Sequence, residues 1–130
     1  MGKQRVLLVD DEIDFQAVMR MRIESWGYEV ITADSGKEAL AQVKDRLADI
    51  VVLDYMMPGL DGISTLEEIR KIDPKIPVIM FTAFPDSRSL KGTEKLGVSA
   101  FIPKLNAFSD NQAALQEAIR LAGKKMEKDS

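Results

Sequence analysis

The sequence predicts an α/β fold, with a doubly wound, five-stranded parallel sheet and five helices. Five short apolar runs, rich in Val and Ile, alternate along the chain with segments whose apolar residues recur at helical spacing. The runs are mostly continuous, which is typical of parallel strands that helices cover on both faces. Because strand and helix alternate throughout, right-handed crossovers should place helices on both sides of one sheet.

The expected strands are the five apolar runs themselves. In chain order they are Val6 to Val9, Tyr28 to Ala33, Ile50 to Leu53, Val78 to Phe81 and Ser99 to Ile102.

The first three expected helices have apolar stripes and recognisable ends. The first should stop at Gly27, and its stripe is Phe15, Val18, Met19, Ile23 and Trp26. A capping box, Ser35 with Glu38, opens the second, whose inward residues should be Ala39, Leu40, Val43 and Leu47. The third should end before Pro74, and its stripe is Ile63, Leu66 and Ile69.

The sequence indicates the last two expected helices with different clarity. Asp86 can cap a fourth, weak helix that carries Gly92 in its middle and ends at Gly97. The fifth is marked by a stripe of Leu115, Ala118, Ile119 and Ala122. We expect one domain over residues 1–130, with a core at about 4–122 and a polar tail at 123–130. Residues 1–5 and about the last eight should fray.

Composition narrows the classes of function. The net charge of −3 disfavours direct binding to nucleic acid or to a membrane surface. The chain has no cysteine and no histidine, so a bound metal ion would need oxygen ligands, as Mg²⁺ and Mn²⁺ do. No apolar run approaches the roughly 20 residues of a membrane span, and no signal peptide is evident. We therefore expect a cytoplasmic location.

Polar residues follow four of the five expected strands. Asp10, Asp11 and Glu12 come after the first, Asp54 after the third, Thr82 after the fourth, and Lys104 after the fifth. In a parallel sheet, ligands bind outside the carboxyl ends of the strands. If these strands are neighbours, the side chains converge on one edge.

This set of side chains predicts phosphoryl transfer. Asp10, Asp11 and Asp54 can share a divalent cation, which turns their mutual repulsion into coordination. Asp54 would be the nucleophile, while Lys104 and Thr82 would hold phosphate oxygens.

The pattern resembles the receiver domain of two-component response regulators. The matching segments are "VLLVDDE", "DIVVLDYMMPGLDG", "PVIMFTA" and "AFIPK", which span essentially residues 4–122. The resemblance implies a flavodoxin-like sheet with strand order 2-1-3-4-5. It also implies that this chain is a signalling domain and not an enzyme, beyond its own phosphorylation and slow autodephosphorylation.

The resemblance implies a role for each matching residue. Asp54 is expected to be the phosphoacceptor, and Asp10, Asp11, Asp54 and the backbone carbonyl of Met56 are expected to hold Mg²⁺ or Mn²⁺. Thr82 and Phe101 should form the switch, with Lys104 as the cation beside the phosphoryl group. Met56 and Phe84 should edge the path of the hydrolytic water, and their apolar bulk predicts slow loss of the phosphoryl group.

Two positions depart from the family pattern. Leu105 follows Lys104 where the family usually has proline after a cis peptide bond, and Pro103 precedes the lysine instead. A cis bond before leucine costs about 3–4 kcal/mol, which leaves the geometry of this loop open. Phe101 lacks the hydroxyl of the commoner tyrosine.

The resemblance also implies partners. Because this chain has no histidine, a phosphohistidine donor must be another protein, either a sensor histidine kinase or a phosphotransfer protein. The face formed by the fourth helix, fifth strand and fifth helix should act on a downstream protein or a covalently linked output domain. A phosphorylation-dependent homodimer through this face is possible.

Three other interpretations stay open at this point. A haloacid-dehalogenase-like phosphatase would need a second Asp where Met56 stands. A flavodoxin-like flavin carrier would need a phosphate-binding loop in place of "DDE". A degenerate receiver would act as a phosphorylation-independent interaction module.

Overall fold

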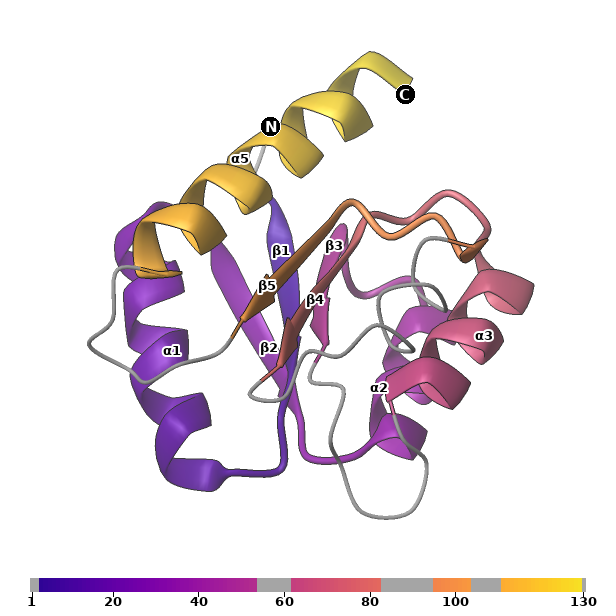
Figure 1. Cartoon of the computed structure of the whole chain (residues 1–130), viewed down its shortest axis with the longest axis horizontal. Helices are drawn as coiled ribbons and strands as arrows, with labels where there is room; N and C mark the ends of the chain where they lie inside the picture. Colours follow the sequence, from indigo (N-terminus) through magenta and orange to yellow (C-terminus); the bar gives the residue numbers. More distant parts are fainter. Residues whose placement is uncertain (1–2, 54–61, 83–94, 104–110, 130) are drawn as a thin grey trace.

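The computed structural model describes residues 3–53, 62–82, 95–103 and 111–129. Its five parallel strands lie in the order β2-β1-β3-β4-β5, and their carboxyl ends point to the same edge (Figure 1). The strands are β1 (Arg5–Val9), β2 (Glu29–Ala33), β3 (Ile50–Leu53), β4 (Val78–Thr82) and β5 (Ala100–Pro103). The helices are α1 (Ile13–Ser25), α2 (Gly36–Lys44), α3 (Gly62–Ile72) and α5 (Asn111–Asp129). The predicted fold class and strand order are confirmed.

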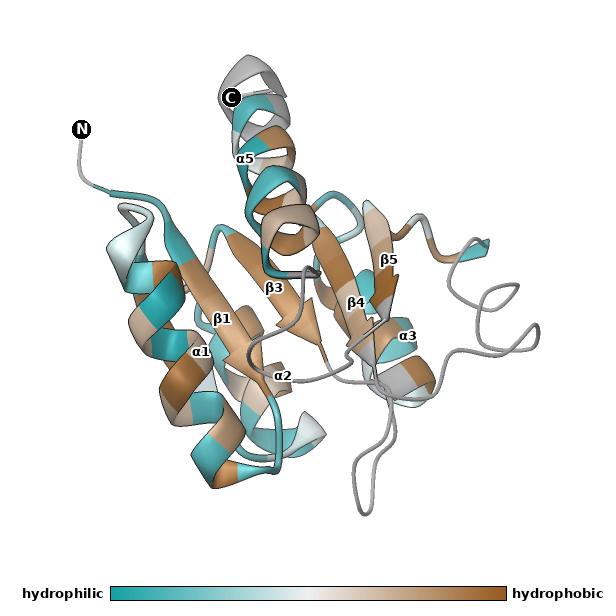
Figure 2. Ribbon diagram, turned by 60° about the vertical axis from the view of Figure 1, so that its left-hand side comes forward, coloured by the Kyte–Doolittle hydropathy of each residue, from teal (hydrophilic) through white to brown (hydrophobic). Residues whose placement is uncertain are grey.

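The central strands form because their residues are apolar on both faces. All four residues of β3 are buried, as are the last four of β1. Figure 2 shows these strands as a hydrophobic layer between helices whose outer surfaces are largely polar. Burial on both faces explains why the strands appear in the sequence as continuous apolar runs.

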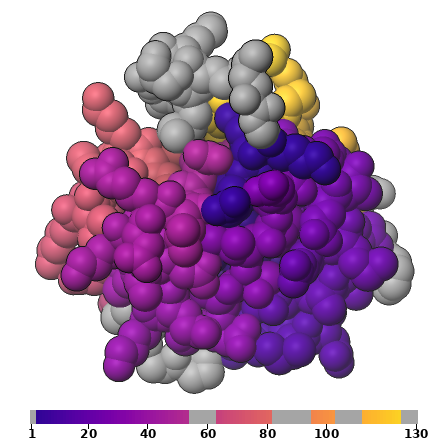
Figure 3. Space-filling view, turned by 180° about the vertical axis from the view of Figure 1, so that it is seen from behind, coloured from indigo at the N-terminus to yellow at the C-terminus, as the bar shows by residue number. Residues whose placement is uncertain are grey.

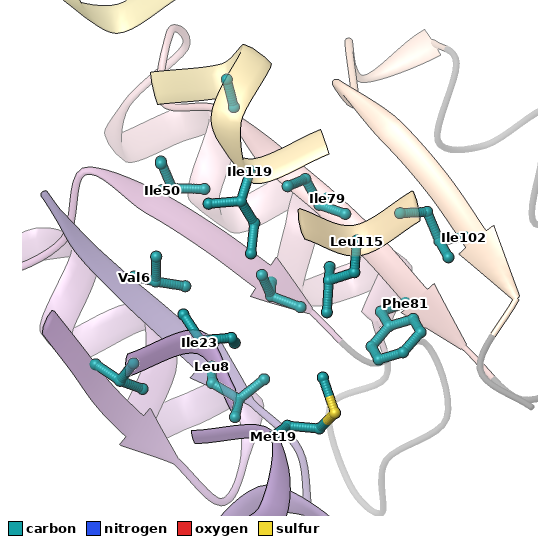
Figure 4. Close-up of a cluster of buried hydrophobic side chains, with 13 residues drawn as sticks. Val6, Leu8, Met19, Ile23, Ile50, Ile79, Phe81, Ile102, Leu115 and Ile119 are labelled. Carbon is teal, nitrogen blue, oxygen red and sulfur yellow. The ribbon is translucent and has the colours of Figure 1, made fainter. Parts of the chain in front are cut away.

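Alternate residues of β1 belong to two separate cores. Val6 and Leu8 pack with residues of α1 and α5, which cover one face of the sheet (Figure 4). Leu7 and Val9 pack with residues of α2 and α3 on the opposite face. The sheet is therefore the middle layer of three.

Two predicted helix ends are confirmed. The hydroxyl of Ser35 accepts the backbone N–H of Glu38 at 3.2 Å, and the Glu38 carboxylate accepts the N–H of Asp34 at 2.7 Å. The hydrogen bond to the Glu38 side chain therefore comes from Asp34, one residue before the N-cap residue Ser35. Gly27 has φ of +100°, a conformation that glycine tolerates best, and it ends α1 as predicted.

Other predicted details are wrong. Leu47 is 40% exposed because α2 ends at Lys44, and the chain then turns through Arg46 at φ 57°. Helix α5 continues to Asp129, through most of the polar segment where we expected a tail, and Arg5 already belongs to β1. Most of the predicted fourth helix falls at 83–94, outside the described residues; Lys95 is helical.

The opposite side of the molecule is formed mainly by α1, β2 and α2, with α3 at the left margin (Figure 3). In the part of the chain that the structure describes, no helix combines the length and the apolar character that a membrane span requires.

Candidate functional site

The carboxyl end of β1 carries the acidic loop, which we define as Asp10, Asp11 and Glu12. Asp10 is 2% exposed, Asp11 is half-buried and Glu12 is exposed. The backbone N–H of Asp10 donates to the carbonyl of Ala33 at 3.1 Å, which extends the pairing of β1 with β2 by one residue. The loop therefore starts from a fixed point on the sheet.

The Asp10 side chain also shapes the turn into α1. Its Oδ1 accepts the backbone N–H of Glu12 at 2.9 Å, an Asx-type turn that directs the chain into the helix. Glu12 is the N-cap residue of α1, and its carbonyl accepts the N–H of Gln16 at 2.9 Å. One oxygen of Asp10 thus has a structural role, and Asp11 lies where the chain changes direction.

Gln16 belongs to this site, although sequence reasoning missed it. Its side-chain Nε2 lies 2.9 Å from the Asp10 carbonyl, 3.0 Å from Asp34 Oδ1 and 3.3 Å from the Ala33 carbonyl. A sequence signal did exist, since Gln16 is a polar residue in register with Met19 and Ile23 on the buried stripe of α1.

Strand register relates the acidic loop to the other predicted site residues. Val9 pairs with Leu53, so Asp10 and Asp54 each follow one of two paired residues on neighbouring strands. Parallel strands lie about 4.8 Å apart, so Val9 and Leu53 are adjacent on the backbone at this edge of the sheet. Thr82 pairs with Pro103, the residue before Lys104, at the same edge of the sheet.

Phe101 lies on the face of the sheet that α2 and α3 cover. It is partly buried and packs against the core that contains Leu7, Val9 and Met80. Its neighbours Ala100 and Ile102 belong to the opposite core, as strand alternation requires.

Several predicted site residues lie outside the described residues, namely Asp54, Met56, Phe84 and Lys104, and so does the peptide bond between Lys104 and Leu105. Thr82 is described only through its backbone in β4. Among the described residues no group of three or more acidic side chains that could hold a metal ion is present. The donors at the end of β1 are carboxylates, and a chain without cysteine or histidine offers oxygen ligands, so the set fits Mg²⁺ or Mn²⁺.

Comparison with known families assigns the chain to one of them. The family described as "Response regulator receiver domain" matches residues 6–119. The chain belongs to this family. The receiver interpretation of the sequence is thereby confirmed, in preference to the phosphatase and the flavin carrier.

Curated relatives of this receiver domain are longer proteins. It is 37% identical over 114 residues to the transcriptional regulatory protein ZraR of Escherichia coli O157:H7, covering 88% of this chain and 26% of ZraR. It is 37% identical over 125 residues to the probable transcriptional regulator ycf27 of Porphyridium aerugineum, covering 95% and 51% respectively. The chain thus spans about a quarter to a half of the length of these relatives.

Solved structures agree with this assignment. A CheY-like receiver domain from Methanospirillum hungatei JF-1 has a TM-score of 0.90 and 26% identity, with coverage of 99% of this chain and 100% of that one. The response regulator TrrA of Thermotoga maritima, solved in complex with Mg(2+)-BeF, has a TM-score of 0.81 and 31% identity, with coverage of 92% and 98%.

Proposed function

We propose that this receiver domain is a phosphoacceptor in two-component signalling and that Asp54 carries the phosphoryl group. The observation that supports the proposal is the register of β1 with β3, in which Val9, the residue before Asp10, pairs with Leu53, the residue before Asp54. A receiver of the same family, TrrA, has been solved with Mg(2+)-BeF.

The proposed reaction is an in-line displacement at phosphorus. A carboxylate oxygen of Asp54 forms a new bond to phosphorus while the bond to the donor breaks, and the donor leaves with the electron pair. Asp10, Asp11, Asp54 and the Met56 carbonyl would hold Mg²⁺ or Mn²⁺, which supplies charge neutralisation when bound. Lys104 would hold a phosphoryl oxygen by its ammonium group, and Thr82 would donate its hydroxyl to another. Positioning and charge account for this chemistry, so a separate general base is not required.

We further propose that the donor is a sensor histidine kinase or a phosphotransfer protein. The absence of histidine from this chain supports a donor in trans if the phosphoryl group comes from phosphohistidine. The output would be a downstream protein or a linked output domain, as the greater length of the relatives suggests.

We propose that phosphorylation changes the surface formed by the fourth helix, β5 and α5. Thr82 would turn toward the phosphoryl group, and Phe101 would fill the space that it leaves. A surface groove of about 500 Å³ already lies between β5 and α5, and it is lined by Ile102, Ala118 and Leu121, among others. Such an apolar surface suits a downstream protein or a second copy of the domain.

The lifetime of the phosphoryl group should be long. Met56 and Phe84 would restrict the approach of water to the acyl phosphate. A phosphate-release assay on Met56→Asn and Phe84→Glu should show faster loss than in the unaltered protein. Equal rates in all three proteins would contradict this role.

The proposed function is tested by intact-protein mass spectrometry after incubation with acetyl phosphate and Mg²⁺. We expect one added phosphoryl group in the unaltered protein, and none in Asp54→Asn. Asp45→Asn is the matched control, because Asp45 is an exposed residue at the end of α2, away from the carboxyl ends of the strands, and it should be labelled normally. Labelling of Asp54→Asn, or no labelling of the unaltered protein, would contradict the proposal.

A further inference from the structure

Gln16 is one of three buried polar or charged residues among those that the structure describes, together with Asp10 and Thr65. It lies in the first turn of α1 and is 8% exposed. Its Nε2 atom has two hydrogens and faces three acceptors, all at the carboxyl ends of β1 and β2: the carbonyls of Asp10 and Ala33 and the carboxylate of Asp34. One side chain thus links the acidic loop to the adjacent strand.

The hydrogen bond from Gln16 to the Asp10 carbonyl comes from a different element than the other hydrogen bonds that hold the acidic loop. The bond from Asp10 N–H to Ala33 continues the sheet, and the bond from Glu12 N–H to Asp10 Oδ1 lies within the loop. Gln16 reaches the Asp10 carbonyl from α1, so it fixes the plane of the peptide that joins Asp10 to Asp11. That plane sets the direction in which the Asp11 side chain leaves the backbone.

The choice of an amide also suits the charge of the site. The acidic loop already has three carboxylates, and Asp34 adds a fourth at the end of the neighbouring strand. Gln16 donates to the Asp34 carboxylate without adding positive charge, so the negative potential that attracts a divalent cation is retained.

We infer that Gln16 is a positioning residue for the metal-binding carboxylates: it holds the peptide between Asp10 and Asp11 in the orientation that binds Mg²⁺. This inference rests on the proposed function. A side chain that orients metal ligands affects metal affinity, and its loss typically weakens binding by about 10–100-fold.

The test compares Gln16→Met with Gln42→Met by calorimetric titration of the unphosphorylated proteins with Mg²⁺. Gln42 is the matched control, because its Nε2 donates to the Thr32 carbonyl of β2 at 3.0 Å from α2, on the other face of the sheet. Both variants lose a hydrogen bond from a side-chain amide to the backbone of β2. Of the two glutamines, only Gln16 also contacts the acidic loop. We expect the dissociation constant to rise about tenfold in Gln16→Met and to change less than about twofold in Gln42→Met. Equal constants in the two variants would overturn the inference.

A second measurement separates positioning from general loosening of the fold. The rate of phosphorylation by acetyl phosphate, measured against Mg²⁺ concentration, should shift to higher Mg²⁺ in Gln16→Met while its maximum stays within about threefold, since Asp54 is unaltered. A maximum that stays depressed at saturating Mg²⁺ would overturn the inference.

The proposed function and the inference about Gln16 fail in different ways. If the unaltered protein binds Mg²⁺ and Gln16→Met binds it equally well, the inference about Gln16 is wrong and the proposed function stands. If the unaltered protein shows no Mg²⁺ binding, both are wrong.

Discussion

Arg70 in α3 joins three separate parts of the backbone, and its replacement by methionine should lower the stability of the domain substantially. Its guanidinium donates to the carbonyls of Ile76 at 2.6 Å and Leu96 at 2.7 Å, and more weakly to those of Gly97 at 3.1 Å and Asp73 at 3.4 Å. The side chain therefore ties α3 both to the segment that enters β4 and to the turn that enters β5.

The expected loss of stability follows from the two shortest hydrogen bonds, to the carbonyls of Ile76 and Leu96. Hydrogen bonds that involve a charged group contribute about 1.5–3 kcal/mol each, and the lower figure applies because Arg70 is only half-buried. Two such bonds give about 3 kcal/mol, and methionine retains much of the apolar contact of the arginine stem. For a domain of this size, that corresponds to a fall in Tm of roughly 10 °C.

The loss of stability in Arg70→Met should not depend on pH between about 5 and 9. Burial lowers the pKa of Arg70 and the nearby Asp73 carboxylate partly offsets this, but a guanidinium stays protonated throughout that range. Because neither the folded nor the unfolded state exchanges a proton at Arg70 there, the stability difference is constant.

Urea unfolding of Arg70→Met beside Lys71→Met measures the effect. Lys71 is the adjacent cation on α3, is exposed, and has an ion pair with Glu68 at 3.0 Å, which is worth less than about 0.5 kcal/mol. A loss in Arg70→Met no greater than that in Lys71→Met would refute the reasoning.

Further predictions concern the fold and the metal ion. Leu66→Ala removes a fully buried side chain between α3 and the sheet and should cost about 2–5 kcal/mol in urea unfolding; a cost below about 1 kcal/mol would contradict the packing. Ser35→Ala removes the N-cap of α2 and should cost about 1 kcal/mol, whereas Ser25→Ala at the exposed end of α1 should cost less than half as much. Gly27→Ala should cost about 1–2 kcal/mol through backbone strain alone, since nothing lies within 4 Å of the added Cβ, and a neutral result in thermal unfolding would count against that conformation. Chelation of divalent cations with EDTA should abolish labelling by acetyl phosphate, and restored Mg²⁺ should recover it; labelling that persists in EDTA would contradict the metal requirement.

The sequence predicted the architecture well because the relevant physics is local. A strand buried on both faces must be apolar at every position, and this gave all five strand starts to within one residue, with β1, β2 and β5 displaced by one. Helix caps are equally local, so Ser35 and Gly27 could be identified from residue type and spacing.

What the sequence could not predict depends on where helices end and what they contact. Leu47 continues the apolar spacing of α2 but lies beyond its end, where helical periodicity no longer determines burial. The polar residues after Ala122 gave no sign that α5 extends to Asp129. Gln16 became part of the site only when α1 and the end of β2 were placed side by side.

The site itself was predicted in part from the positions of acids after strands. The structure places Asp10 and Asp11 at the carboxyl end of β1, and Leu53, the residue before Asp54, pairs with Val9. The roles of Asp54, Thr82, Lys104, Met56 and Phe84 stay predictions.

The most direct measurement locates the covalent modification on the chain. The protein is incubated with acetyl phosphate and Mg²⁺, reduced with borohydride, which converts an aspartyl phosphate to homoserine, and analysed by peptide mass spectrometry. We expect homoserine at position 54 alone, and only when Mg²⁺ was present. Homoserine at Asp10, Asp11 or another carboxylate, or none anywhere, would contradict it.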